Sequence, residues 1–164
     1  MRSYRLLVVI LFGAVLAASQ APATIFLVRH AEKAAPSGDV PLSDAGRARA
    51  QTLTHVLADA GVRNIFVTEF QRTKETVAPS AKKFHVSPET LPAADVDRLA
   101  SRLRATPAGV AVLVVGHSNT LPMILEMLGA GAVRPIDDGE YDRLFIVTIQ
   151  AGRARLLTLR YGNP

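Results

Sequence analysis

Two short, uninterrupted apolar runs, each followed within two positions by a histidine, constrain the fold of this chain most. The run TIFLV at 24–28 leads into Arg29 and His30, and the run VAVLVV at 110–115 leads, after one glycine, into His117. Continuous apolar runs of this length are typical of strands that are buried on both faces of a parallel sheet. The sequence therefore predicts interior strands that end at histidines.

Strand-like and helix-like segments alternate along the rest of the chain. Helices are expected from a cap at Ser43 to about Ala60, from Thr68 through Ala81, over Asp95–Arg104 and over Leu121–Leu128. Further strands are expected over Asn64–Thr68, Leu144–Ile149 and Ala154–Leu159. This alternation predicts a three-layer α/β/α domain with a mainly parallel central sheet that ends in an antiparallel hairpin.

The N-terminal segment has the pattern of a secretory signal. Arg2 and Arg5 precede an acid-free apolar stretch at 6–18, which small residues follow. A helix that spans a membrane needs roughly 20 apolar residues, so this stretch is short for a retained anchor. We expect a signal peptide over residues 1–23, with its cleavage point open, and a single periplasmic or secreted domain over residues 24–164 that contacts a membrane only through that peptide.

Composition narrows the function classes. Of the 164 residues 49% are apolar, which suits a domain with a sizeable core rather than a disordered chain. The absence of cysteine excludes disulfides and thiolate chemistry. The net charge of +5 comes from scattered Arg and Lys residues with no basic run interleaved with aromatic residues, so no nucleic-acid partner is expected.

Four basic or ionisable residues are expected at one edge of the sheet. Arg29, His30 and His117 follow two predicted strands, and Arg72 lies in the helix after a third strand. Because ligands bind beyond the carboxyl ends of such strands, these side chains can converge on one pocket. Arginine forks suit the oxygens of a phosphoryl dianion, and nearby cations keep an imidazole neutral and nucleophilic. Neither a metal nor another cofactor is expected, because the sequence has no His-x-x-x-His pair and no dense Asp cluster.

Four segments around these residues occur in a fixed order. They are LVRHAEK at 27–33, LSDAGRARA at 42–50, TEFQRTKET at 68–76 and VLVVGHSN at 112–119. At these segments the chain resembles the histidine phosphatase superfamily, also called the phosphoglycerate-mutase-like family. The resemblance implies a phosphoglycerate mutase-like fold, with His30 as the nucleophile that forms a phosphohistidine. It also implies that Arg29 and Arg72 bind phosphate and that His117 stabilises the transferring group.

The chain departs from the family pattern beside the nucleophile. The family often has Gly and then a hydroxyl residue at the positions where this chain has Ala31 and Lys33. Lys33 can supply extra positive charge to a substrate, and Asn119 can either contact substrate or cap the helix that follows it. The Arg-His-Gly-x-Arg motif and the His-Asp pair of the acid-phosphatase and phytase branch are absent, and the mutases are longer, so net hydrolysis is favoured over phosphate migration.

The spacing of the motifs does not identify the general acid. The candidates by residue type are Glu32, Glu69, Glu89, Glu140 and Asp142. Glu32 is the nearest of them to His30 in sequence, and its alternative role is an ion pair that orients Arg29 or Arg72. The leading hypothesis is a metal-independent phosphatase that acts on a phosphomonoester or a phosphohistidine, carried by a small molecule, a protein or a glycan. The alternatives are a non-catalytic phosphate-binding module and a small phosphomutase.

Overall fold

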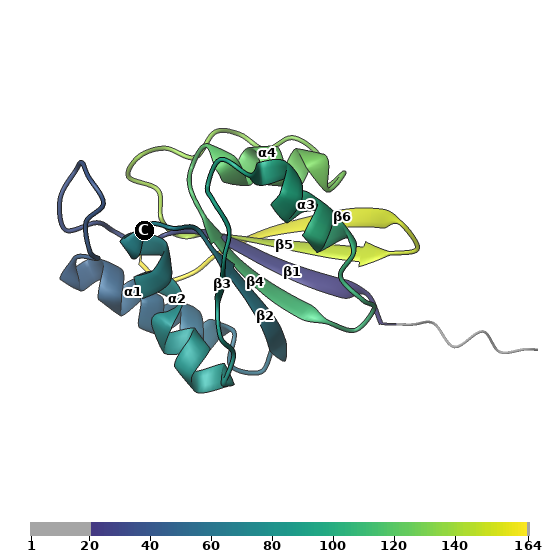
Figure 1. Cartoon of the computed structure of the whole chain (residues 1–164), viewed down its shortest axis with the longest axis horizontal. Coiled ribbons are helices and arrows are strands. Elements are labelled where there is room, and N and C mark those ends of the chain that lie inside the picture. The colour runs from purple at the N-terminus through teal and green to yellow at the C-terminus, as the bar shows by residue number, and fades with distance from the viewer. Residues whose placement is uncertain (1–20, 164) are drawn as a thin grey trace, which may run out of the picture.

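The central sheet has the strand order β3-β2-β4-β1-β5-β6, so β1 and β4, the two strands that histidines directly follow, are neighbours (Figure 1). The computed structural model of the chain describes residues 21–163, and the predicted signal peptide lies, up to residue 20, outside them. The strands are β1 (Ala23–Arg29), β2 (Val62–Val67), β3 (Glu89–Thr90), β4 (Ala111–Gly116), β5 (Arg143–Gln150) and β6 (Arg153–Arg160). The pairs β1–β4, β4–β2 and β2–β3 are parallel, and β5 and β6 add an antiparallel hairpin.

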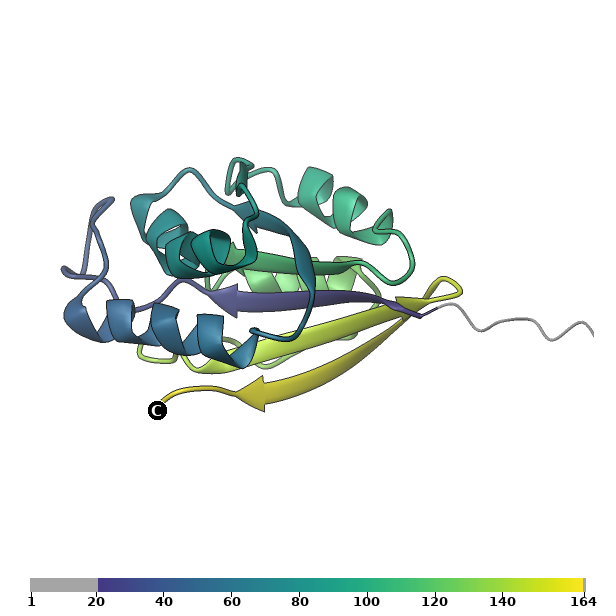
Figure 2. The same cartoon turned by 90° about the horizontal axis from the view of Figure 1, so that it is seen from below.

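Helices cover both faces of this sheet. Helices α1 (Asp44–Val56) and α2 (Gln71–Phe84) lie on one face, and α3 (Val96–Arg104) and α4 (Thr120–Met127) lie on the other (Figures 1 and 2). The mixed α/β architecture, with a mainly parallel central sheet between two helical layers, confirms the predicted fold class.

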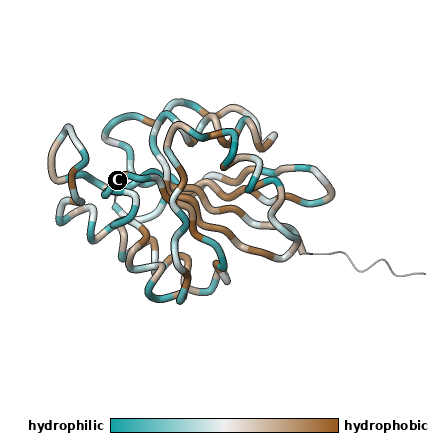
Figure 3. Tube along the Cα trace, in the orientation of Figure 1, coloured by the Kyte–Doolittle hydropathy of each residue, from teal (hydrophilic) through white to brown (hydrophobic). Residues whose placement is uncertain are grey.

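The core lies on the two faces of the central strands, which are the most apolar part of residues 21–163 (Figure 3). Side chains that point to opposite faces alternate along each strand, so Leu27 packs toward α3 and α4 while Val28 packs toward α1 and α2. Every residue of β4 is buried, as its continuous apolar run predicts. A rigid sheet therefore fixes the positions of the residues that directly follow β1 and β4.

The helices begin and end a few residues from their predicted limits. Ser43 caps α1, because its hydroxyl accepts a hydrogen bond from the Gly46 backbone, but the helix ends at Val56 rather than at Ala60. Helix α2 begins at Gln71 and not at Thr68, whose hydroxyl contacts His117 instead of capping the helix. The two-residue strand β3 was not predicted, since a pair of exposed residues carries no apolar pattern.

Candidate active site

Strand register brings the two histidines together. Arg29 pairs with Gly116 at the end of the β1–β4 ladder, and the His30 backbone N–H donates to the Gly116 carbonyl at 2.9 Å. The next residue along β4 is His117, and the two imidazole centroids lie 5.4 Å apart in an edge-to-face arrangement. The predicted convergence at the carboxyl edge of the sheet is therefore observed for both histidines.

One hydrogen bond sets the tautomer of His30. Its Nδ1 lies 2.8 Å from the Ala31 carbonyl oxygen, and because a carbonyl only accepts, Nδ1 must carry the proton. Burial, together with the neighbouring His117, Arg29 and Arg72, lowers the pKa of His30 to about 3. At neutral pH the ring is therefore uncharged, and Nε2 holds a free lone pair. A neutral imidazole with this orientation is a nitrogen nucleophile.

His117 is buried and uncharged in the same way. Burial and the positive charges of Arg72 and Arg29 lower its pKa to about 4, although the carboxylate of Glu69 opposes this shift. Its Nε2 lies 3.0 Å from the Thr68 hydroxyl, and its backbone N–H donates to the Thr120 hydroxyl at 3.1 Å. The ring is thus held by Thr68, which directly follows β2, and the backbone of His117 is held by Thr120, the first residue of α4.

Arg29 joins the end of β1 to the loop before β5. Its Nη1 donates to the carbonyl oxygens of Asp137, Asp138 and Glu140 at 2.8, 2.9 and 3.2 Å. The Tyr141 ring lies 4.3 Å from the guanidinium carbon. The Nε of Arg29 is buried and has no hydrogen-bond partner among the described residues. The edge of the guanidinium that bears Nε and Nη2 is therefore the one left for a ligand.

Arg72, the second residue of α2, presents a similar unfilled donor. Its guanidinium carbon lies 4.2 Å from the Phe70 ring, and its Nη1 is 3.9 Å from the Asp39 carboxylate. Its Nε, like that of Arg29, is buried without a partner in the described part of the chain. Two buried guanidinium N–H groups thus have no acceptor among the described residues and are available to donate to an anion.

These groups line an open cavity of about 480 Å³ at the carboxyl edge of the sheet. Its walls are Arg29, His30, Lys33, Phe70, Arg72, Ala93, Ala94, His117, Ser118, Asn119, Thr120 and Asp138. Three cationic side chains and one carboxyl group make the wall positive overall. The cavity also meets the start of α4, where a helix end favours negative charge.

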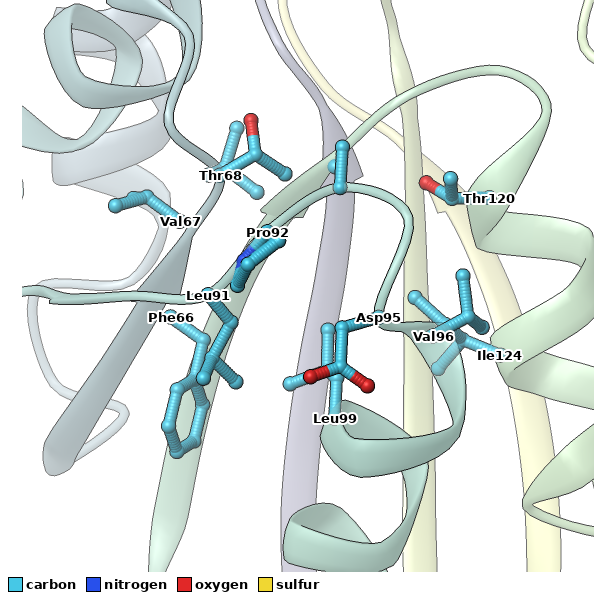
Figure 4. A pocket seen from close by; sticks show the side chains of 13 residues that line it. Phe66, Val67, Thr68, Leu91, Pro92, Asp95, Val96, Leu99, Thr120 and Ile124 are labelled. Carbon is cyan, nitrogen blue, oxygen red and sulfur yellow. The ribbon is translucent and has the colours of Figure 1, made fainter.

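A second, much smaller pocket lies between the ends of β2 and β4 and the 91–96 loop (Figure 4). Its free volume of about 20 Å³ has room for about one water molecule. Apolar side chains, including Phe66, Leu91 and Ile124, form most of it, and Thr68 and Thr120 lie at its upper end in this view. The two threonines that contact His117 thus face a largely apolar environment.

The cavity includes both predicted substrate-binding residues but not the predicted general acid. Lys33 and Asn119 line it, and Asn119 makes no side-chain cap bond with α4. The Glu32 carboxylate instead accepts three hydrogen bonds from Arg49 at 2.7–3.0 Å. The alternative role considered for Glu32, an ion pair with an arginine, is therefore observed, but the partner is Arg49 of α1.

Two aromatic residues of the site, Phe70 and Tyr141, were not predicted from the sequence. Phe70 packs against Arg72 and lies edge-on to His117, with ring centroids 5.3 Å apart. Tyr141 covers Arg29, and its ring centroid is 6.1 Å from that of His30. Phe70 directly precedes the helix that bears Arg72, and this position in the sequence could have identified it as part of the site. Tyr141 lies in the loop before β5, and no feature of the sequence links it to the site.

Within residues 21–163, His, Asp and Glu side chains do not gather in the groups of three or more that could hold a metal ion. No helix in this part of the chain has the length and apolar character to span a membrane.

The fold is that of a phosphoglycerate mutase-like α/β protein, and two histidines and two arginines line one cavity at the carboxyl edge of its sheet. A family model, the histidine phosphatase superfamily (branch 1), matches residues 25–95. This segment contains His30 and Arg72. The resemblance predicted from the motifs is thereby confirmed, and the chain carries the fold and the N-terminal motifs of the histidine phosphatase superfamily.

Solved structures share this fold at low sequence identity. The protein histidine phosphatase SixA complexed with tungstate has a TM-score of 0.65 at 23% identity, over 84% of this chain and 96% of that one. The α-ribazole phosphatase from Shigella flexneri has a TM-score of 0.66 at 18% identity, with the same coverage. A phosphoglycerate mutase from Plasmodium falciparum has a TM-score of 0.60 at 17% identity, over 87% and 91%. Comparison with curated protein sequences gives no significant match.

Proposed function

We propose that this protein is a phosphatase that hydrolyses a phosphomonoester through a phosphohistidine at His30. The observation that carries the proposal is the orientation of His30, whose Nδ1–H is committed to the Ala31 carbonyl and whose Nε2 is free beside two unfilled guanidinium donors. A phosphoryl group held by Arg29 and Arg72 would present phosphorus to that lone pair.

The chemistry takes two displacements at phosphorus. In the first, Nε2 of His30 forms a P–N bond while the bond from phosphorus to the leaving group breaks, and the departing oxygen, or the nitrogen of a phosphohistidine, takes a proton from water. In the second, water attacks phosphorus and gives a proton to solvent, the P–N bond breaks to restore the lone pair on Nε2, and inorganic phosphate leaves the two arginines. The guanidinium groups of Arg29 and Arg72 balance the charge on the phosphoryl oxygens in both steps.

We place first the substrates whose leaving group needs little protonation. Among the described residues, Asp138 is the carboxyl residue that lines the cavity, and the Glu69 carboxylate beside the wall already accepts a hydrogen bond from the Ala93 backbone at 2.8 Å. A phosphohistidine or an aryl phosphate has a better leaving group than an alkyl phosphate, so we place these substrates first. The names of two structural relatives, a protein histidine phosphatase and an α-ribazole phosphatase, agree with a phosphatase but leave the substrate open.

Phosphate release from a panel of substrates tests the proposal. Wild type, His30→Ala and the control His55→Ala, which changes an exposed histidine on α1, are compared in EDTA with aryl phosphates, alkyl phosphates and phosphohistidine. We expect release by wild type and by the control but not by His30→Ala. Release that survives in His30→Ala contradicts the mechanism, and tungstate binding without any release supports the phosphate-binding module instead.

We also propose that the domain acts outside the cytoplasm, on a phosphorylated small molecule, protein or glycan. The support is the sequence of the first 23 residues, in which Arg2 and Arg5 precede the apolar stretch. Fractionation of cells that express the full chain tests this, since export predicts a shortened protein in the periplasm or the medium. An unshortened protein in the cytoplasm contradicts it.

A further inference from the structure

We propose that Thr68 and Thr73 position His117, by fixing its ring proton on Nε2 so that binding of a phosphoryl dianion takes up one proton from solvent at Nδ1. The inference rests on the phosphate site proposed above, but it concerns the state of the ring before any turnover. It assigns a role to two hydroxyl groups that do not touch the reacting atoms.

The two threonines form a chain of short contacts behind the ring. The Thr68 hydroxyl oxygen lies 3.0 Å from Nε2 of His117 and 3.0 Å from the Thr73 hydroxyl oxygen. The Thr73 hydroxyl in turn lies 2.8 Å from the Phe70 carbonyl oxygen and 3.1 Å from that of Thr68. The Thr73 side chain is fully buried, and those of Thr68 and His117 are nearly so.

Counting the available protons shows which group donates in each of these hydrogen bonds. Three links need a proton: ring to Thr68, Thr68 to Thr73, and Thr73 to a backbone carbonyl. The two hydroxyl groups supply only two protons, and the carbonyl supplies none. Thr73 must therefore donate to the carbonyl and Thr68 must donate to Thr73, so the third proton has to come from Nε2 of His117.

The surroundings hold this arrangement in place. Thr68 lies at the end of β2 beside the small, mostly apolar pocket of Figure 4, where little water can replace a lost partner. Moving the ring proton to Nδ1 would leave one of the three links without a hydrogen. An unpaired polar contact is costly in such a site. Thr68 and Thr73 thus act on the ring as a positioning pair.

This tautomer has a consequence for phosphate binding. With Nε2 committed to Thr68, Nδ1 is the ring nitrogen left for the ligand, and in the neutral ring it bears a lone pair. A phosphoryl oxygen would repel that lone pair, so the dianion is bound best when Nδ1 gains a proton. The charged groups that act on the ring are Arg72, Arg29 and Glu69, with neutral His30 beside it. The two arginines lower the pKa of His117 in the free protein, and the negative charge of a bound dianion would raise it.

The tautomer is measured first, in the free protein. Nitrogen-15 NMR of labelled histidine, with His117 assigned by its loss in His117→Asn, distinguishes Nε2–H from Nδ1–H without any substrate. We expect Nε2–H in wild type and in Thr68→Ser, which keeps the hydroxyl, and a mixed or inverted ring in Thr68→Val. A wild-type ring that carries its proton on Nδ1 overturns the proposal, whether or not the variants fold.

Proton uptake is measured next, with tungstate as the probe because it stays a dianion near neutral pH. Calorimetric titrations in buffers of different ionisation enthalpy give the number of protons bound with each anion. We expect about one proton for wild type and Thr68→Ser and clearly less for Thr68→Val. Tungstate binding to wild type without proton uptake overturns the proposal.

The two proposals fail separately. If no phosphate ester is hydrolysed, yet the free ring is Nε2–H and tungstate binds with proton uptake, the positioning role stands and the catalytic proposal falls. If esters are hydrolysed through His30 but the ring is Nδ1–H, the positioning role alone is wrong. In an active enzyme we expect kcat/KM to fall at least tenfold in Thr68→Val and to stay within about threefold in Thr68→Ser.

Discussion

Mild acid should destabilise this fold through the two buried histidines at the carboxyl edge of the sheet. In the folded protein the pKa of His30 is lowered to about 3 and that of His117 to about 4, chiefly by burial. In the unfolded chain each imidazole returns to a pKa of about 6.5. The unfolded state therefore binds the extra protons, and the folded state loses stability as the pH falls below about 6.5.

The size of the loss follows from these values. Each proton that only the unfolded chain binds lowers the free energy of unfolding by about 1.4 kcal/mol per pH unit. Between about pH 6.5 and pH 5 this gives about 2 kcal/mol for each histidine, and about 4 kcal/mol for the two together. Because both folded pKa values lie below pH 5, the result depends on the unfolded pKa more than on the exact folded ones.

Urea denaturation at pH 7.5 and at pH 5 measures this difference. The comparison is between wild type, His30→Asn and the double variant His30→Asn/His117→Asn, since an asparagine amide can donate to the Ala31 carbonyl but does not titrate. We expect the double variant to lose about 4 kcal/mol less than wild type, and the single variant about 2 kcal/mol less. His55→Asn, an exposed control on α1, should follow wild type. Equal pH slopes for wild type and the double variant would refute the reasoning.

Three substitutions separate catalytic roles from structural ones. Arg29→Lys should lower kcat/KM on the order of 100-fold in steady-state kinetics. A single lysine ammonium cannot both bind the carbonyl oxygens of the 137–140 loop and donate two parallel hydrogen bonds to phosphate. Glu32→Gln should cost about 2 kcal/mol in urea denaturation through its lost ion pair with Arg49, with kcat/KM within about twofold; a larger kinetic loss would restore Glu32 as an acid. Tyr141→Leu should weaken tungstate binding about fivefold by calorimetry, and unchanged affinity would show that stacking on Arg29 is unimportant.

Local patterns were enough to predict five of the six strands and to predict that four basic or ionisable residues lie at one edge of the sheet. Continuous apolar runs identify β1 and β4, and the residues that follow such strands lie at one edge whatever the rest of the chain does. This is why Arg29, His30 and His117 were found from the sequence. Arg72 was found because it lies in the first turn of the helix after β2.

Tertiary contacts between distant residues were beyond the same reasoning. Arg29 and the Glu140 carbonyl that it binds are separated by 111 positions, and no periodicity links them. Thr68 has the type and position of a helix cap, so only the packed structure shows that its hydroxyl belongs to His117. Glu32 stands two residues after His30, yet its carboxylate binds Arg49, because a partner in α1 becomes visible only once the helix is packed.

Trapping the covalent intermediate tests the central claim most directly. The protein is mixed with a substrate labelled in its phosphoryl group, stopped in alkali, where phosphohistidine survives, and mapped by mass spectrometry. We predict one phosphoryl group on the imidazole of His30, lost on acid treatment and absent from His30→Ala. Turnover without a labelled protein, or the same label on His30→Ala, would contradict nucleophilic attack by His30.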